Sequence, residues 1–202
     1  MGHIKQEITF DSSGDTIKGV LFLPVSNKKA PVLIICHAAM DFKENYFELC
    51  RHLVCRGIAA LALDMHGNGQ SRGKRFHVNI GCWVNDIVSA IDYLIWRQSP
   101  RIQEMWSNFP LPGAADSFMV DTIKRVGNIL SPVMVLHGSD DKVDTPENAY
   151  MLFDALSCIK DIRVIPQSGH LALLDTNKAM VMELISGWAL RYLGEGKDPR
   201  YI

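Results

Sequence analysis

Short apolar runs alternate with helical patterns along most of this chain, and this alternation limits the folds that it can form. Residues 31–36 and 58–63 are unbroken apolar runs, as expected for strands covered on both faces. Between them, residues 43–56 place apolar side chains at helical spacing, and Gly57 ends the helix. This strand–helix–strand order predicts an α/β fold with a mostly parallel twisted sheet and helices on both faces.

The same alternation returns after residue 131, and a different pattern precedes it. Residues 4–10 and 16–23 alternate polar and apolar side chains around a turn, which predicts an N-terminal antiparallel hairpin. The other expected elements are a long helix through Trp83 that ends near Arg97, a strand to Leu136, a helix opened by Thr145 and Pro146, a strand to Ile165, and a final helix through Trp188.

The interval 98–130 does not follow this rhythm. Pro110, Pro112 and Gly113 interrupt it, and only residues 116–126 have a helical pattern. A strand, a turn, a helix and a return strand need about 30 residues or more, so this interval is short for a complete unit. We therefore predict one domain over residues 1–202, with 98–130 as an irregular or cap-like connection.

The composition excludes several classes of partner. The 21 basic and 22 acidic residues nearly cancel, so the chain lacks the positive charge that nucleic acid or an anionic membrane attracts. A small molecule is the expected partner. No apolar run is long enough to span a bilayer, and the first residues have no apolar signal core. The five cysteines form no paired pattern, which favours reduced thiols, no metal site and a cytoplasmic protein.

Two of the expected strands end in residues that suit acid–base chemistry. Residues 133–141 read Val-Met-Val-Leu-His-Gly-Ser-Asp-Asp, and residues 162–170 read Ile-Arg-Val-Ile-Pro-Gln-Ser-Gly-His. A histidine that titrates near neutrality can take a proton from a nucleophile and return it to a leaving group. An aspartate can orient that ring and stabilise the imidazolium. We therefore predict that His170 is a general base, against the simpler interpretation of a hydrogen-bonded histidine at a strand end.

A dinucleotide site is the competing interpretation of the glycines after residue 63. Gly67 and Gly69 follow a strand, as in a G-x-G-x-x-G turn. The third glycine of that turn would fall at position 72, which is arginine, and no ribose-binding acid follows at the required place. The sequence therefore does not predict a nucleotide cofactor.

Four motifs together resemble the α/β-hydrolase superfamily, in its serine-hydrolase or esterase-like form. The likeness covers the chain to about residue 97 and again from about residue 121 to 193. The motifs are Ile-Cys-His-Ala-Ala-Met at 35–40, Asp-Met-His-Gly-Asn-Gly-Gln-Ser at 64–71, His-Gly-Ser-Asp-Asp at 137–141, and Ser-Gly-His at 168–170.

The resemblance implies roles for particular residues. Asp141, three residues after Gly138, is the expected triad acid; Asp140 is an adjacent alternative, and Asp144 belongs to the next helix. The backbone amides of Ala39 or Met40 would hold the substrate oxyanion, and no cofactor is required. The expected rim of the site consists of His37, Asp64, Ser71 and Trp106, with Asp64 and Ser71 in a hydrogen-bonded turn and Trp106 in a cluster that packs inside or lines a pocket.

The nucleophile of such an enzyme is not found. A serine hydrolase carries it on a tight strand-to-helix turn of the form G-x-S-x-G, and we expect no such pentad in this chain. Ser99, Ser107 and Ser117 lack the small neighbours that an exposed elbow needs, and Cys82 lies within a helix. We therefore predict that the nucleophile elbow is absent.

Loss of that unit would leave strands 32–36 and 133–136 without their usual neighbours, which is costly because backbone groups need partners. Three arrangements follow: the two strands pair directly, a second copy supplies a strand in a homodimer or strand swap, or the chain is an incomplete version of a longer enzyme. The expected function is a serine hydrolase that acts on a small ester, thioester or amide by acyl transfer to water. The alternative is an inactive binding or interaction protein that kept the scaffold.

Overall fold

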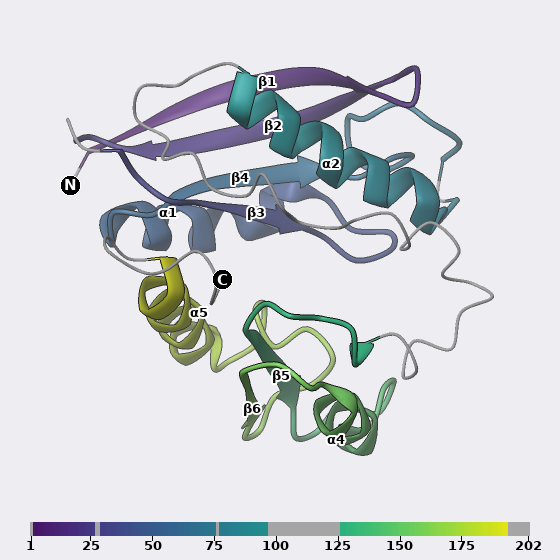
Figure 1. Cartoon of the computed structure of the whole chain (residues 1–202), viewed down its shortest axis with the longest axis vertical. Helices are drawn as coiled ribbons and strands as arrows, with labels where there is room; N and C mark the ends of the chain where they lie inside the picture. The colour runs from purple at the N-terminus through teal and green to yellow at the C-terminus, as the bar shows by residue number, and fades with distance from the viewer. Residues whose placement is uncertain (1, 27–28, 76, 97–125, 194–202) are drawn as a thin grey trace. The chain divides into compact units, whose positions relative to one another are not determined.

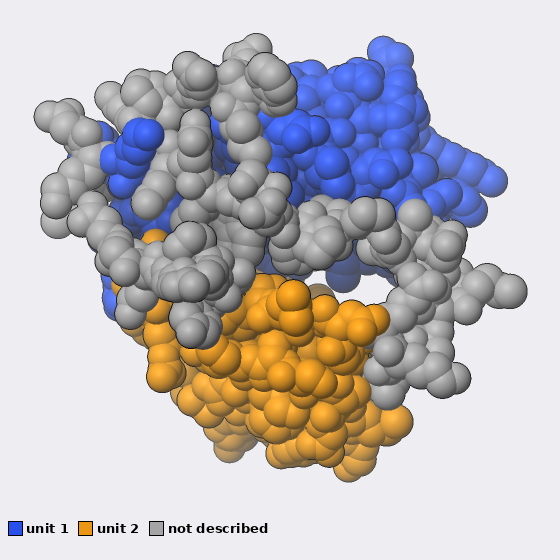
Figure 2. Space-filling view, viewed as in Figure 1, with its two compact units in different colours: residues 1–119 blue, residues 120–202 orange. Residues whose placement is uncertain are grey.

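The computed structural model describes residues 2–26, 29–75, 77–96 and 126–193 (Figure 1). The chain divides into two compact units, residues 1–119 and 120–202 (Figure 2). Most of the predicted connection at 98–130, and all but the last residue of the helix expected at 116–126, lie outside the described residues. The single-domain organisation therefore stays a prediction, and each unit is described by itself.

The first unit begins with the predicted hairpin. Strand β1 (His3–Ser12) pairs antiparallel with β2 (Asp15–Pro24), in a register that joins Ser12 to Asp15. Only Ser13 and Gly14 form the turn, and both have positive φ, at 54° and 83°. Two left-handed residues match the right-handed twist of the flanking strands, so this short turn closes the hairpin without splaying it. The hairpin prediction is confirmed, with longer strands than expected.

Strand β4 (Ala59–Asp64) is the buried centre of a four-stranded sheet with the order β1-β2-β4-β3. All six of its residues are buried, as expected from an unbroken apolar run. It pairs antiparallel with β2 and parallel with β3 (Val32–Cys36), so that Leu61 lies opposite both Leu21 and Ile34. The predicted β3–helix–β4 unit is confirmed. The sheet as a whole is mixed, because the hairpin adds two antiparallel pairings.

Helices cover both faces of this sheet, as predicted (Figure 1). Neighbouring residues of a strand point to opposite faces, and β2 shows this directly. Phe22 contacts Phe47 at the start of α1 (Phe47–Cys55), with ring centroids 5.2 Å apart. Leu21 belongs to the cluster that α2 (Ile80–Trp96) covers with Ala90 and Leu94.

The helix expected at 43–56 begins differently from the prediction. Residues Lys43–Tyr46 form a 3₁₀ turn, η1, and the α-helix proper is α1. Lys43 is buried there, because its ammonium group pairs with Asp64 at the end of β4. Helical spacing alone cannot predict this turn, since the ion pair that fixes it joins residues far apart in the sequence. Gly57 ends the helix with φ of 79°, as predicted.

The second unit contains a parallel pair of strands with a helix between them in sequence. Strand β5 (Val133–Gly138) pairs in parallel with β6 (Lys160–Ile165). Helix α4 (Pro146–Ala155) has Thr145 at its N-cap and Pro146 in its first turn, as predicted. Val135, Ala149 and Leu156 form part of the core between the strands and this helix. Helix α5 (Lys178–Leu193) follows β6.

Within the described ranges, no helix is long and apolar enough to cross a membrane.

The hairpin core offers a small stability test. Ile17 is 0% exposed in β2, whereas Ile4 in β1 is 39% exposed. We expect Ile17→Val to lower the free energy of unfolding by about 1 kcal/mol, because one buried methyl group is lost and a small void remains. Ile4→Val removes the same methyl group at a partly exposed position. Urea unfolding that showed equal effects for the two variants would contradict the placement of Ile17 in the core.

Candidate active site

The second unit brings together the predicted base and acid. Asp141 follows β5 and His170 follows β6, and the ring Nδ1 of His170 donates to Asp141 Oδ2 at 2.9 Å. The Asp141 side chain is 2% exposed and the His170 side chain is 49% exposed. Parallel strands carry the residues after their carboxyl ends to the same sheet edge, which explains the contact. Because Nδ1 is engaged with Asp141, the other ring nitrogen of His170, Nε2, is available to exchange a proton.

Backbone contacts hold the two loops in place. Ser139 N–H donates to Ile165 O at 2.8 Å, and Asp140 N–H donates to Ser168 O at 2.9 Å. The loop after β6 passes so close to Gly138 that a Cβ atom there would lie 2.3 Å from the carbonyl oxygens of Ser168 and Gly169. Only glycine fits this position without moving the backbone. The glycine of the His-Gly-Ser-Asp-Asp motif thus permits the approach that places the acid beside the base.

Asp141 is held as a carboxylate by several donors. Its Oδ1 accepts hydrogen bonds from the amides of Val143 and Asp144, at 2.9 and 3.0 Å. Burial alone would raise the pKa of Asp141, but the hydrogen bonds from Asp144, His170 and Val143 outweigh it and lower the pKa to about 2. Asp141 thus stays ionised at any pH at which His170 could act as a base.

This low pKa can be measured directly. We expect the Asp141 carboxyl carbon to titrate by NMR with a midpoint at about pH 2, because the amide and imidazole donors favour the charged form. Replacing His170 by alanine removes one of those donors and should raise the midpoint. A midpoint near the ordinary aspartate value in the native chain, with no change in the variant, would contradict the hydrogen bond between these residues.

Three neighbouring residues take other places. Asp140 is exposed and accepts a hydrogen bond from the Ser139 hydroxyl at 2.7 Å, so of the two adjacent aspartates it is Asp141 that contacts His170. Asp144 lies at the start of α4, as predicted, where its carboxylate accepts from the Asn148 side chain at 2.6 Å. His137 was not predicted as a contact, yet its Nε2 lies 3.4 Å from Asp141 Oδ2 and 2.8 Å from Asp144 O.

The first unit contains the other predicted site residues. His37 follows β3 and is 3% exposed. Its Nε2 accepts from Met65 N–H at 2.9 Å, so the ring proton is on Nδ1, which lies 2.7 Å from Ala38 O. Both ring nitrogens are therefore occupied, and His37 fixes the loop.

Ala39 and Met40 form an exposed turn after His37. Met40 has φ of 60°, an uncommon left-handed conformation for a residue with a side chain, and it is 76% exposed. Within the described part of the chain, neither amide N–H donates a hydrogen bond. Strained backbone with free amides is often found at functional sites. The turn thus has the features of an oxyanion donor, and that role stays a prediction.

Asp64 at the end of β4 and Ser71 in the loop that follows are both buried and hydrogen-bonded. The Asp64 carboxylate accepts from the Gln70 amide at 2.8 Å and pairs with Lys43. The Ser71 hydroxyl donates to Asp64 O at 2.6 Å and accepts from Lys18 N–H at 2.9 Å. These contacts match the expected structural turn. Trp106 lies outside the described residues.

The expectation that the chain has no G-x-S-x-G pentad is wrong, because the pattern occurs once in the sequence, at Gly69-Gln-Ser71-Arg-Gly73. It is not a nucleophile elbow, because an elbow presents an exposed hydroxyl between a strand and a helix. Ser71 is instead 2% exposed, and its hydroxyl is engaged in the two hydrogen bonds given above. The sequence pattern alone would suggest a nucleophile, whereas the burial and hydrogen bonds of Ser71 show that it has a structural role.

A charged cluster around the buried Asp86 was not predicted from the sequence. His66 Nε2 lies 2.9 Å from Asp15 Oδ2, and Nδ1 lies 3.2 Å from Asp86 Oδ1. Asp86 is 0% exposed and also accepts from the His66 amide at 2.8 Å. Burial would lower the pKa of His66, but the hydrogen bonds to Asp15 and Asp86 raise it. This His66 cluster joins the hairpin, the loop after β4 and helix α2.

No group of three or more metal-ligating side chains is found among the residues that the structure describes.

Comparisons with known proteins bear on the fold. The model of the family described as serine aminopeptidase, S33, matches residues 27–106. The fold is similar to Est1E from Butyrivibrio proteoclasticus, solved with ferulic acid, at 16% identity and a TM-score of 0.75 over 93% of this chain and 100% of that one. It is also similar to a dienelactone hydrolase from Anabaena variabilis, at 17% identity and a TM-score of 0.69 over 94% and 98% of the two chains. No curated protein sequence matches.

A third similar structure is a cold-adapted esterase from an Arctic intertidal metagenomic library, at 17% identity and a TM-score of 0.65 over 91% of this chain and 93% of that one. At such identities the likeness to solved structures shows the fold alone. The mixed sheet, its covering helices and the matched family together define an α/β-hydrolase fold. The chain therefore has an α/β-hydrolase fold, as predicted, and its residues 27–106 match the family model described as serine aminopeptidase, S33.

Proposed function

We propose that this protein is a serine hydrolase that acts on a small carboxylic ester, thioester or amide by acyl transfer to water. The observation that carries the proposal is the hydrogen bond between His170 Nδ1 and Asp141 Oδ2. It orients an imidazole, leaves the other ring nitrogen available, and supplies a carboxylate that is already ionised. The α/β-hydrolase fold and the family match over residues 27–106 support the same reaction class.

In the proposed reaction, His170 both accepts and returns a proton, and Asp141 stabilises its protonated form. His170 Nε2 takes the proton from a serine hydroxyl as the serine oxygen attacks the substrate carbonyl. The resulting imidazolium is stabilised by the Asp141 carboxylate, and it returns the proton to the leaving group when the carbon–heteroatom bond breaks. Water then attacks the acyl-enzyme by the same route and releases the acid. No cofactor is needed for these steps.

Two further roles belong to this proposal. The free amides of Ala39 and Met40 would donate to the oxyanion that forms on the substrate carbonyl. The proposed nucleophile is a serine that the described residues do not identify; Ser99, Ser107 and Ser117, which lack the small neighbours of an elbow, lie outside those residues. Buried, hydrogen-bonded Ser71 is excluded from that role by its contacts.

Fluorophosphonate labelling tests the proposal. An activated serine displaces fluoride from the probe, so we expect one label per chain, which peptide mass spectrometry should place on a serine other than Ser71. The variant Ser71→Ala should label as the native chain does, provided that circular dichroism shows it folded. A folded native protein that takes no label would contradict the proposal.

An inactive binding protein is the second candidate. The observation that favours it is that the only G-x-S-x-G pattern in the sequence surrounds a serine whose hydroxyl is buried. Absence of labelling together with saturable binding of an ester that is never hydrolysed would support this candidate.

We also propose a cytoplasmic protein with a small-molecule partner, and neither nucleic acid nor membrane as a partner. The net charge of −1 supports this, as does the finding that all five cysteines are free. Cys50 is 0% exposed, and burial raises the pKa of its thiol to about 12, which makes it unreactive. The homodimer or strand swap stays a prediction, which light scattering at several protein concentrations would test.

A further inference from the structure

A tyrosine of η1 closes the turn that contains Ala39 and Met40, whose amides donate no hydrogen bond among the described residues. The hydroxyl of Tyr46 donates to Asp41 Oδ2 at 2.8 Å, and it also accepts a hydrogen bond from the backbone amide of Ala38. Ala38 and Asp41 lie directly before and after the two free amides. One hydroxyl group therefore holds both ends of this turn, which we call the 38–41 turn.

Further contacts fix the ends of the 38–41 turn and leave its middle open. At its start, His37 Nδ1 donates to Ala38 O at 2.7 Å. At its end, Asp41 Oδ1 accepts from the Phe42 amide at 2.8 Å and from the Asn45 side chain at 2.5 Å. Both carboxylate oxygens of Asp41 are therefore engaged, so the acceptor that faces the tyrosine hydroxyl has a fixed direction.

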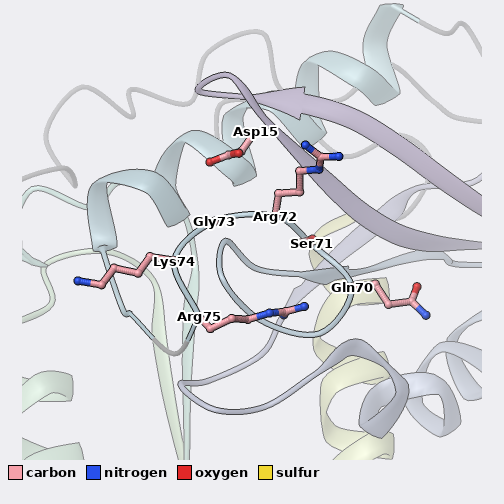
Figure 3. A pocket seen from close by; sticks show the side chains of 7 residues that line it. All are labelled: Asp15, Gln70, Ser71, Arg72, Gly73, Lys74 and Arg75. Atoms are coloured by element: carbon pink, nitrogen blue, oxygen red, sulfur yellow. The ribbon is translucent and has the colours of Figure 1, made fainter.

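The 3₁₀ turn η1, which supplies Tyr46, is anchored to the end of β4 and to the loop that follows. Lys43 N–H donates to Asp64 Oδ1 at 2.9 Å, and Lys43 Nζ donates to Gln70 Oε1 at 3.4 Å. Figure 3 shows this loop and labels Gln70. Asp64 is 0% exposed, so its ion pair with Lys43 is shielded from water. The backbone that carries the tyrosine is therefore held in place.

The Tyr46 hydroxyl keeps its proton at any pH at which a histidine base acts. Burial raises the pKa of Tyr46, and the hydrogen bond to the Asp41 carboxylate raises it further, whereas the Ala38 amide lowers it by less. A protonated phenol can donate one hydrogen bond and accept another at the same time. Phenylalanine at this position would keep the ring and lose both hydrogen bonds.

We propose that Tyr46 is a positioning residue, whose hydroxyl holds the 38–41 turn in the shape that presents the amides of Ala39 and Met40 to the substrate oxyanion. The inference rests on the proposed serine-hydrolase function and adds a residue to it. An oxyanion donor is effective when it is oriented before the reaction, because no reorganisation is then needed. Met40 needs such support, since its left-handed backbone, with φ of 60°, is unfavourable for a residue with a side chain.

Amide hydrogen exchange of the whole chain tests the contact without reference to activity. The Ala38 amide is hydrogen-bonded in the native chain, so we expect it to exchange at least about tenfold faster in Tyr46→Phe. The free amides of Ala39 and Met40 should exchange fast in both proteins. Equal exchange of the Ala38 amide in the native chain and the variant would overturn the inference.

Ester kinetics test the consequence for catalysis. Tyr46→Phe should lower kcat for a small chromogenic ester by about tenfold and change KM by less than about twofold, because the amides act on the oxyanion rather than on the bound substrate. A trifluoromethyl ketone gains an oxyanion when a serine oxygen adds to its carbonyl carbon. Its affinity should therefore fall by the same factor as kcat/KM. A role in stability alone would not produce this agreement.

Two further variants complete the experiment. Tyr150→Phe is the matched control, because it removes the hydroxyl of a tyrosine that is 49% exposed, and it should keep the native kcat. Asp41→Asn removes the charge that accepts the Tyr46 hydrogen bond, and should lower kcat in the same direction as Tyr46→Phe.

The outcomes separate this inference from the proposed function. Native kcat in the folded Tyr46→Phe chain, or in Asp41→Asn if only that variant folds, would overturn the positioning role and leave the proposed hydrolase standing. A native chain that hydrolyses no ester and takes no fluorophosphonate label would overturn both together.

Discussion

Replacing His170 by alanine should lower kcat/KM for a small ester by about 10³-fold, with the loss almost entirely in kcat. His170 Nε2 is the atom that takes and returns the proton in the proposed reaction, so its loss acts on the chemical step rather than on substrate binding. Its side chain is 49% exposed, so truncation removes little packing. Hydrolysis of a chromogenic ester and thermal unfolding of the same samples would measure both effects.

A second histidine serves as the control for this experiment. His77 is exposed, and within the described residues its side chain has no partner. His77→Ala should therefore keep the native rate. The Tm of His170→Ala should fall by no more than about 4 °C, as for loss of one exposed hydrogen bond in a chain of this size. Undiminished hydrolysis by the folded His170→Ala variant would remove His170 from the mechanism.

The contact between Asp141 and His170 was predictable, because each residue follows a strand that the local sequence pattern already indicates. Each apolar strand run ends in a motif with its polar residue at a fixed place, and parallel strands bring those ends to one edge. The choice between Asp140 and Asp141 needed the resemblance, since adjacent residues follow the same strand. The turn after Gly138 separates them physically, because Asp141 accepts the Val143 and Asp144 amides while Asp140 remains exposed.

The His66 cluster was not predictable, because its contacts join residues far apart in the chain. Asp15 is 51 residues from His66, and Asp86 is 20 residues from it. The sequence shows only a histidine after a buried strand, and hairpin and helix patterns do not say which acid faces it. The same holds for Lys43, whose partner Asp64 is 21 residues away. Hydrophobic patterns with a period of two or 3.6 residues predict strands and helices. Ion pairs between distant residues depend instead on how those strands and helices pack.

Replacing Asp86 by asparagine should lower the free energy of unfolding by about 3 kcal/mol near neutral pH. Both Asp86 oxygens accept hydrogen bonds from His66, one from the amide and one from ring Nδ1. An asparagine keeps only one acceptor and turns an N–H₂ group toward a donor, so a buried donor loses its partner. Asp92 on the same helix is exposed, and Asp92→Asn should change stability by less than about 0.5 kcal/mol.

The stability difference between the native chain and Asp86→Asn should also depend on pH in one direction. The pKa of His66 is raised in the folded chain, so its protonated ring adds stability that is fully present below the unfolded value of about 6.5. That stability is lost as pH rises through the folded pKa. Urea unfolding between pH 6 and pH 9 should therefore show the difference shrinking with pH. A difference that grew with pH would mean that His66 is neutral in the folded chain.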